Sequence, residues 1–184
     1  MRIGLMAIVA VGLAGCGSGT SLNPFADSVE LPCPFVRVLA DGETYLRFRP
    51  GTEPARDNLE LEARFIAVDF ACDYDDSDDP KSAMALDLSI VVAAERGPSM
   101  PAGGTERLPY FVALIGPDRS VVTRQSFEAA MLFPEEGAQF ILADPEEVTL
   151  DFPAGGAVAP WEYEVVVSFQ LTEEQLARQL ENRR

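Results

Sequence analysis

The stretch MALDLSIVV, residues 84–92, alternates apolar and polar side chains with a period of two. Successive side chains of an extended strand point to opposite faces of a sheet, so this period is typical of a strand with one buried face. The stretch therefore predicts a strand whose core face is formed by Met84, Leu86, Leu88, Ile90 and Val92.

The same period recurs on both sides of this strand. Residues 161–171 alternate from Trp161 onward and predict a half-buried antiparallel strand. Residues 35–39 and 44–48 are separated by Asp41-Gly42, a turn signal typical of a hairpin, so we expect these two strands to pair.

Further strands are expected between these runs. The apolar phase changes within residues 59–72, and because a period of two cannot change phase without an extra residue, we expect a β-bulge near Phe65-Ile66. Residues 110–115 and 121–133 read as strands joined by a turn at 116–118, and residues 139–152 add one more.

Seven or eight such segments, separated by short turns, predict an all-β fold. We expect residues 33–171 to form an antiparallel β-sandwich of immunoglobulin-like or fibronectin-like type, with its topology open and a barrel as the alternative. A parallel α/β sheet is disfavoured because no amphipathic segments separate the strands.

Residues 172–184 predict a short C-terminal helix. Thr172 and Gln175 have the spacing of a capping box, and acidic residues follow at the positive end of the helix dipole. Leu176 and Leu180 supply only a narrow apolar stripe, which would rest on the sandwich or on a partner.

The first sixteen residues, MRIGLMAIVAVGLAGC, have the build of an export leader. Their apolar run is about a dozen residues long, whereas a helix needs roughly 20 to cross a bilayer. Leu13-Ala14-Gly15-Cys16 resembles the cleavage motif of bacterial lipoproteins. The resemblance implies removal of residues 1–15, lipidation of Cys16 and a flexible tether over 16–32; the alternative is an ordinary secretory leader followed by an unrelated cysteine.

Two further cysteines, Cys33 and Cys72, remain for the exported domain. An even number of cysteines in an oxidising compartment predicts a disulfide, and closing a loop of this length stabilises the fold by about 4 kcal/mol. We expect a structural bond, since no close Cys-x-x-Cys pair is present.

The composition excludes several classes of function. The chain has 30 acidic residues against 14 basic ones, a net charge of −16 that would repel nucleic acid. It has no histidine, which excludes Ser-His-Asp and Cys-His catalysis and His-ligated metals. No phosphate-binding glycine motif indicates a nucleotide, and no resident cofactor is expected.

An acidic run follows Cys72 and is a weak candidate for calcium. Clustered carboxylates can supply the oxygens that Ca²⁺ prefers, although the spacing does not fit an EF-hand. A solvated hairpin loop explains the same residues. The candidate ligands are Asp73, Asp75, Asp76, Asp78 and Asp79.

Two other groups of charged residues are candidate sites. Arg37, Arg47 and Arg49 lie in strands expected to be neighbours and could form a spot that binds an anion or a partner, or could simply form ion pairs. A set of carboxylates could in principle hold a general acid and base, but adjacency in sequence does not establish the separation that this chemistry needs, and a solvated loop is the favoured interpretation. That set is Glu135, Glu136, Asp144, Glu146 and Glu147.

The whole chain resembles a group of uncharacterised lipoproteins from Gram-negative bacteria. The resemblance rests on the motif ending at Cys16 and on short matches along the chain, and it implies a location and no activity. Gly17 lacks the aspartate that retains enteric lipoproteins at the inner membrane, so the implied location is the outer membrane, facing the periplasm. The matches are Cys33-Pro34, Cys72 to Tyr74, Arg96-Gly97-Pro98, Tyr110-Phe111 and Phe169-Gln170-Leu171-Thr172.

These observations lead to two expectations for function. The first is a non-catalytic, membrane-anchored periplasmic lipoprotein that binds an envelope protein or has a structural role, with no nucleic acid or nucleotide partner. The second is a Ca²⁺-dependent binder or a carboxylate-based enzyme that uses the loop from Asp73 to Asp79.

Overall fold

The structure, a computed structural model, describes residues 31–76, 78–135, 140–142 and 146–182. The leader, Cys16 and the tether up to residue 30 lie outside the described residues, as do Glu136 and Asp144. In the described part of the chain, no helix has the length and apolar character needed to span a membrane.

The alternating stretch of residues 84–92 forms the first part of β4 (Met84–Arg96), a central strand of a five-stranded antiparallel sheet. On one side of β4 lies β3 (Leu59–Tyr74), followed by β2 (Thr44–Phe48). On the other side, β7 (Phe140–Leu142) and β8 (Glu146–Phe152) pair with successive parts of β4. Because its inward side chains are fully covered, β4 forms much of the core.

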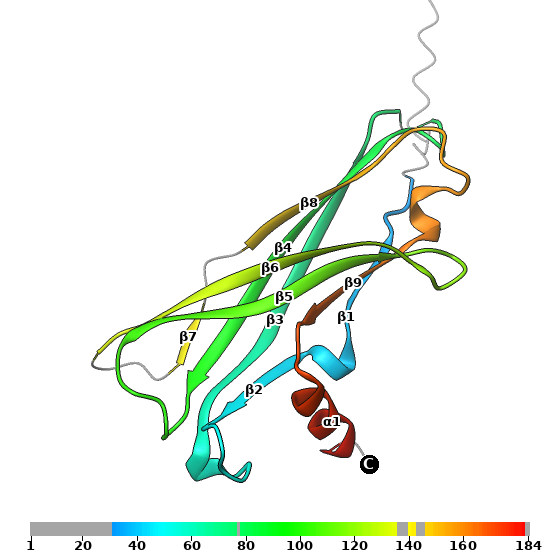
Figure 1. Cartoon of the computed structure of the whole chain (residues 1–184). Helices are drawn as coiled ribbons and strands as arrows, with labels where there is room; N and C mark the ends of the chain where they lie inside the picture. The colour runs from blue at the N-terminus through cyan, green and yellow to red at the C-terminus, as the bar shows by residue number, and fades with distance from the viewer. Residues whose placement is uncertain (1–30, 77, 136–139, 143–145, 183–184) are drawn as a thin grey trace, which may run out of the picture.

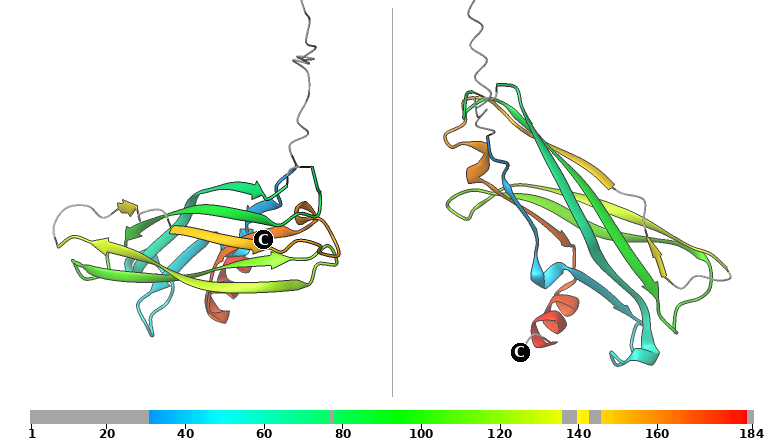
Figure 2. Two further views of the ribbon diagram at one scale, coloured as in Figure 1. Left: turned by 90° about the horizontal axis from the view of Figure 1, so that it is seen from above. Right: turned by 180° about the vertical axis from the view of Figure 1, so that it is seen from behind.

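The second sheet has four strands in the order β1, β9, β5, β6. Its bounds are β1 (Phe35–Val38), β9 (Glu164–Phe169), β5 (Gly104–Ile115) and β6 (Val121–Phe133). The pair β1–β9 is parallel, whereas the other described pairs are antiparallel. Figure 2 shows the two sheets as separate layers when the domain is seen from above.

The predicted all-β antiparallel sandwich with a short C-terminal helix is therefore confirmed. Its core lies between the sheets and combines the inward face of β4 with residues such as Tyr110, Phe133 and Phe169. The strand order differs from the ABED and CFG sheets of immunoglobulin domains, so the likeness to them is one of architecture.

The predicted hairpin between residues 35–39 and 44–48 is wrong. β1 pairs with β9 in one sheet and β2 pairs with β3 in the other, and the 3-10 helix η1 (Ala40–Gly42) carries the chain between them. Gly42 packs so closely on β9 that an added Cβ would lie 1.8 Å from the Ser168 hydroxyl. A residue without a side chain is therefore needed at position 42, where η1 lies against β9.

Three other predictions are sharpened. The bulge near Phe65-Ile66 is confirmed by a register shift between Phe65 and Ala67. The strand expected over 161–171 is shorter, because Pro160–Glu162 forms the 3-10 helix η3. The same strand is not half-buried as predicted, because Ser168, on the face away from the core, is only 3% exposed and packs under η1.

The last element, α1 (Glu173–Asn182), begins with the predicted capping box. The Thr172 hydroxyl accepts a hydrogen bond from the Gln175 backbone N–H, and the Gln175 side chain accepts one from the Thr172 backbone N–H. In Figure 1, α1 lies at the end of the domain opposite the first described residues. We call the end that holds the first described residues, from Leu31, the tether end, after the expected tether. We call the end that holds α1 the distal end.

Candidate functional site

The tether end is closed by the predicted disulfide. Cys33, just before β1, is bonded to Cys72 near the end of β3, with their Cα atoms 5.8 Å apart. The Tyr74 hydroxyl donates a 2.7 Å hydrogen bond to the Pro32 carbonyl, and burial raises the pKa of Tyr74. The start of the domain is therefore fixed to β3 by a covalent bond and a hydrogen bond.

The acidic loop beside this bond is organised by its own backbone. The Asp76 carboxylate accepts the Asp78 backbone N–H, and the Asp79 carboxylate accepts that of Lys81, both at 2.9 Å. Such bonds are typical of turns formed by aspartate. Among the residues that the structure describes, no group of three or more acidic or cysteine side chains could hold a metal ion.

The three arginines proposed as an anion spot are not brought together as the sequence suggested, because β1 and β2 lie in different sheets. Arg37 forms an ion pair with Glu164. Arg47 bridges the two sheets, with nitrogen–oxygen distances of 3.0 Å to Glu60 and 2.6 Å to Glu106. These contacts correspond to the ion-pairing alternative.

The bridging role of Arg47 affects its titration. Its hydrogen bond to Glu106, aided by the nearby charge of Glu60, raises the pKa of Arg47 despite partial burial. Arg49 follows β2 and is exposed, and its backbone carbonyl accepts the Thr52 hydroxyl at 2.8 Å.

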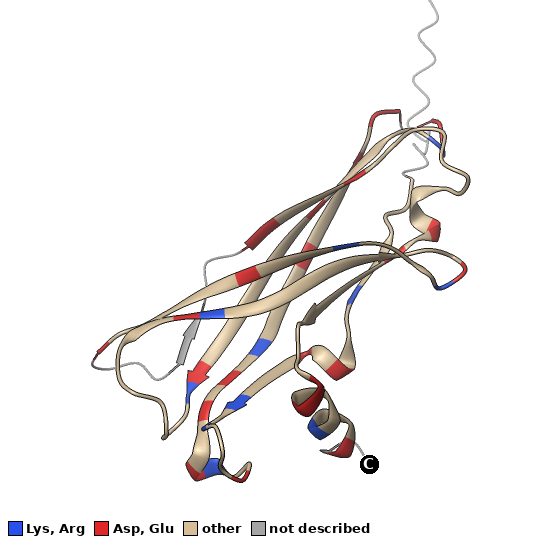
Figure 3. Ribbon diagram, in the orientation of Figure 1, with Lys and Arg blue, Asp and Glu red and all other residues tan. Residues whose placement is uncertain are grey.

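The third set of carboxylates is partly described. Glu147, on β8, accepts a 2.9 Å hydrogen bond from the Ser89 hydroxyl on β4. Glu146 lies next to it in the same strand, and Glu135 follows β6. The hydrogen bond between Ser89 and Glu147 lies on the outer face of the five-stranded sheet, because Ser89 alternates with the buried Leu88 and Ile90. Figure 3 marks the acidic positions of the strands in red.

The distal end holds two shallow hollows on either side of β2. The larger, about 610 Å³, lies between β2, the start of β3 and the end of β4, and the smaller, about 170 Å³, lies between β2 and α1. Leu46, Phe48 and Pro54 line both. Arg56 and Arg96 share the larger hollow with Asp57, Glu62 and Glu95, so its lining has mixed charge.

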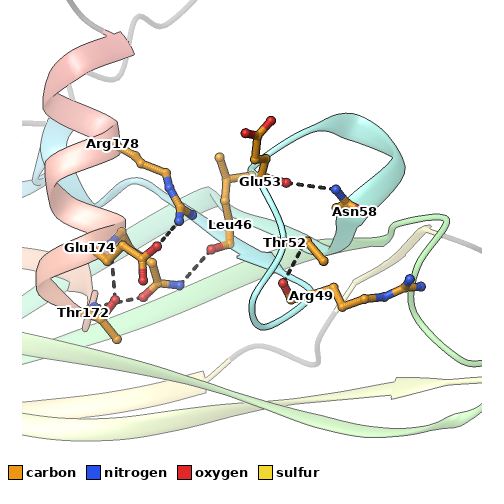
Figure 4. Close-up of polar contacts among 9 residues, drawn as sticks. Leu46, Arg49, Thr52, Glu53, Asn58, Thr172, Glu174 and Arg178 are labelled. Carbon is orange, nitrogen blue, oxygen red and sulfur yellow. Dashed lines mark hydrogen bonds and ion pairs between the residues drawn. The ribbon is translucent and has the colours of Figure 1, made fainter.

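The outer edge of β2 is covered by α1 through side-chain amides. Gln175 and Gln179 donate to the backbone carbonyls of Leu46 and Thr44, at 2.8 and 3.0 Å. Figure 4 shows Leu46 close to the start of α1, beside the ion pair of Arg178 with Glu174. The two glutamines are about one helical turn apart, and this distance is close to that between two outward carbonyls of the strand. The helix therefore provides hydrogen-bond donors for the edge of β2.

This docking covers the expected apolar stripe only in part. Leu176 and Leu180 are 40% and 43% exposed, whereas the side chains that face β2 are polar. Of the two alternatives, packing on the sandwich or on a partner, the structure shows the helix on the sandwich of its own domain. The residues that carry the contact were missed, because the spacing of Gln175 and Gln179 has no meaning until the partner strand is known.

A third surface lies on the open side of the sandwich, between β1 and β3. A groove of about 290 Å³ is lined by Val36, Arg37 and Val38 on β1 and by Phe65–Val68 on β3. We call it the β1–β3 groove. Its β3 residues lie just beyond Arg64, which is the last residue of β3 that pairs with β2.

The comparisons with known proteins give no match. Neither the family models nor the curated proteins nor the solved structures include one that is significantly similar to this chain. The candidate site is therefore judged from its own geometry.

Proposed function

We propose that this chain is a lipid-anchored lipoprotein of the bacterial outer membrane, facing the periplasm, that acts without catalysis by binding a partner protein at the β1–β3 groove. The leader that ends at Cys16 supports the anchor, and the disulfide supports an exported domain. Two of the three candidate arginines, Arg37 and Arg47, form ion pairs within the domain.

One observation carries the binding role. Within the described residues, β3 has a strand neighbour on one side only from Ile66 to Tyr74, and two large apolar side chains of this part, Ile66 and Phe70, are each 46% exposed. Unpaired strand edges beside apolar surface are characteristic places for another chain to add.

Site-specific photocrosslinking in a Gram-negative host tests both parts of the proposal. A photoreactive residue at position 70 should form adducts with an envelope protein, whereas one at Leu132, which is 71% exposed on β6, should not. Cys16→Ser should release the protein from the membrane fraction and abolish labelling by radioactive palmitate. Adducts at neither position would contradict the binding role, and unchanged membrane retention would contradict the anchor.

A further inference from the structure

The free edge of β3, Ile66–Asp73, is unpaired because β2 is much shorter than β3. β2 has 5 residues and β3 has 16. β2 pairs with residues from Leu59 to Arg64, while β4 continues beside β3 as far as Tyr74. Along the free edge, alternate backbone N–H and C=O groups therefore point away from β4 and toward solvent.

The inward face of this edge is incompletely covered. Phe70 pairs in register with Leu88, which is fully buried, so Phe70 points toward the core side of the sheet, yet it is 46% exposed. Phe65, on the same face, stacks on Phe169 of the other sheet at 4.2 Å between ring centroids. The second sheet thus covers Phe65 and leaves Phe70 partly open. On the same strand, Val68, Cys72 and Tyr74 pack against the core.

The β1–β3 groove supplies the opposite wall for an added strand. Val36 and Val38 point toward the core from β1, which is the edge of its own sheet. An extended segment placed beside β3 would present every second side chain to Ile66, Phe70 and these valines. Those side chains would have to be apolar to complete the core.

The outward face of the same edge is acidic. Asp69 and Asp73 are exposed, and neither forms an ion pair within the part of the chain that the structure describes. Asp87 and Asp151 are exposed on the same face, on the neighbouring strands β4 and β8. Because opposite charges favour each other across neighbouring strands, an added strand would be stabilised by outward basic side chains.

The basic residues near the groove do not reverse this preference. Arg37 is paired with Glu164, and Arg64 lies in the half of β3 that β2 already covers. A second copy of this chain would bring a net charge of −16 and the same acidic edge. Residues 17–31 contain Asp27 and Glu30 and no Lys or Arg, so the charge of the tether does not fit either.

We infer that the free edge of β3 binds an extended peptide with alternating apolar and basic side chains, which adds to the five-stranded sheet as a new edge strand. The inference rests on the proposed function and names the chemistry of the partner. The apolar residues fill the opening around Ile66 and Phe70, and the basic residues lie beside Asp69 and Asp73.

The test uses the full chain in detergent and two synthetic nine-residue peptides with blocked ends. One alternates Val with Lys and the other alternates Val with Glu, so they share the apolar face and differ only in charge. We expect the Lys peptide to bind at least tenfold more tightly, by fluorescence anisotropy, and to slow amide hydrogen exchange along Ile66–Asp73. Exchange slowed elsewhere and not along this edge would overturn the inference.

A charge reversal gives the matched control. Asp69→Lys with Asp73→Lys should reverse the preference toward the Glu peptide. Glu53→Lys with Glu181→Lys changes the net charge equally, at exposed positions in the loop after β2 and in α1, and should leave the preference unchanged. An equal response of both double variants would mean that the preference reflects overall charge only, and would overturn the inference.

The remaining outcomes separate this inference from the proposed function. Crosslinks at position 70 in cells, together with no preference for the Lys peptide, would retain the binding role and reject this partner chemistry. A dimer in analytical ultracentrifugation that is lost in Phe70→Lys would assign the edge to a second copy and overturn the inference. Absence of crosslinks and of peptide binding would reject both.

Discussion

β2 and the free edge of β3 lie on the same side of the five-stranded sheet, yet only β2 is covered. Two glutamine amides of α1 satisfy the outward carbonyls of β2, at Leu46 and Thr44. Along Ile66–Asp73, no described element does the same. α1 therefore covers the edge of β2, whereas the free edge of β3 stays open beside the β1–β3 groove.

The difference shows that the domain covers one of two adjoining edge segments and leaves the other, which is open because β2 is short, without a described strand neighbour. α1 covers the backbone groups that β2 would otherwise expose. Covering an edge strand with a helix is a known way to prevent unwanted strand pairing. The neighbouring edge instead carries exposed Phe70 and Ile66, which favour the addition of a strand. We therefore interpret the free edge as a binding surface.

The largest effect is expected at the covalent bond that holds the open part of β3. Cys33→Ser with Cys72→Ser should lower the free energy of unfolding by about 4 kcal/mol, because the unfolded chain regains the freedom of a 39-residue loop. Urea unfolding measures it, with chemical reduction of the wild-type protein as the control. A loss below about 1 kcal/mol would show that the bond does not constrain the fold.

The two phenylalanines of β3 compare its covered and open halves directly. Phe65→Ala should lower the free energy of unfolding by about 3 kcal/mol, because the stack on Phe169 is lost and a cavity forms. Phe70→Ala should cost about 1 kcal/mol or less, because that side chain is already 46% exposed. Equal losses in urea unfolding would contradict the distinction between the halves.

Tyr110 serves as a reference in the core that both halves share. Its ring stacks on Phe127 at 5.3 Å, its hydroxyl has no hydrogen-bond partner in the described structure, and burial raises its pKa to about 12. The folded protein holds this proton more tightly than the unfolded chain, whose tyrosine pKa is about 10. The stabilising effect is complete below pH 10 and is lost as the pH rises toward 12.

We expect this loss to reach roughly 2 kcal/mol by pH 12. Urea unfolding of the wild-type protein and of Tyr110→Phe measures it, because the variant lacks this proton and should lose less stability over the same pH range. At pH 8, Tyr110→Phe should be at least as stable as the wild type, since a buried hydroxyl without a partner is removed. Parallel pH profiles would contradict the burial of this hydroxyl.

The smallest effect is expected at the helix that covers β2. Gln179→Ala should cost about 1 kcal/mol, the net value of one hydrogen bond, and Gln175→Ala somewhat more because the capping box is also lost. Gln170→Ala, at an exposed position before α1, is the control. If hydrogen exchange along β2 is unchanged in both variants, the helix does not protect that edge.

Local patterns predicted the strands well and their partners poorly. The alternation of residues 84–92 defines the buried face of β4 because side-chain direction in a strand depends only on the local backbone. The hairpin at Asp41-Gly42 failed because β1 finds a different partner, β9, more than 120 residues later in sequence. Turn propensity does not report such long-range competition.

The candidate site shows the same division. The phase change at Phe65-Ile66 predicted the bulge, and the difference in length between β2 and β3 could have indicated that part of β3 is unpaired. Gln175 and Gln179 gave no signal, because glutamine on a helix is ordinarily a solvated residue. Their role depends on a strand more than 125 residues earlier in the chain.

The most direct test of the open edge is amide hydrogen exchange along β3, measured residue by residue on the full-length protein without a partner. From Ile66 to Asp73 we expect fast and slow amides to alternate, since only every second N–H is bonded to β4. Amides of β3 between Leu61 and Arg64, which have strands on both sides, should all be slow. Uniform protection from Ile66 to Asp73 would mean that this edge is already paired and would contradict the account.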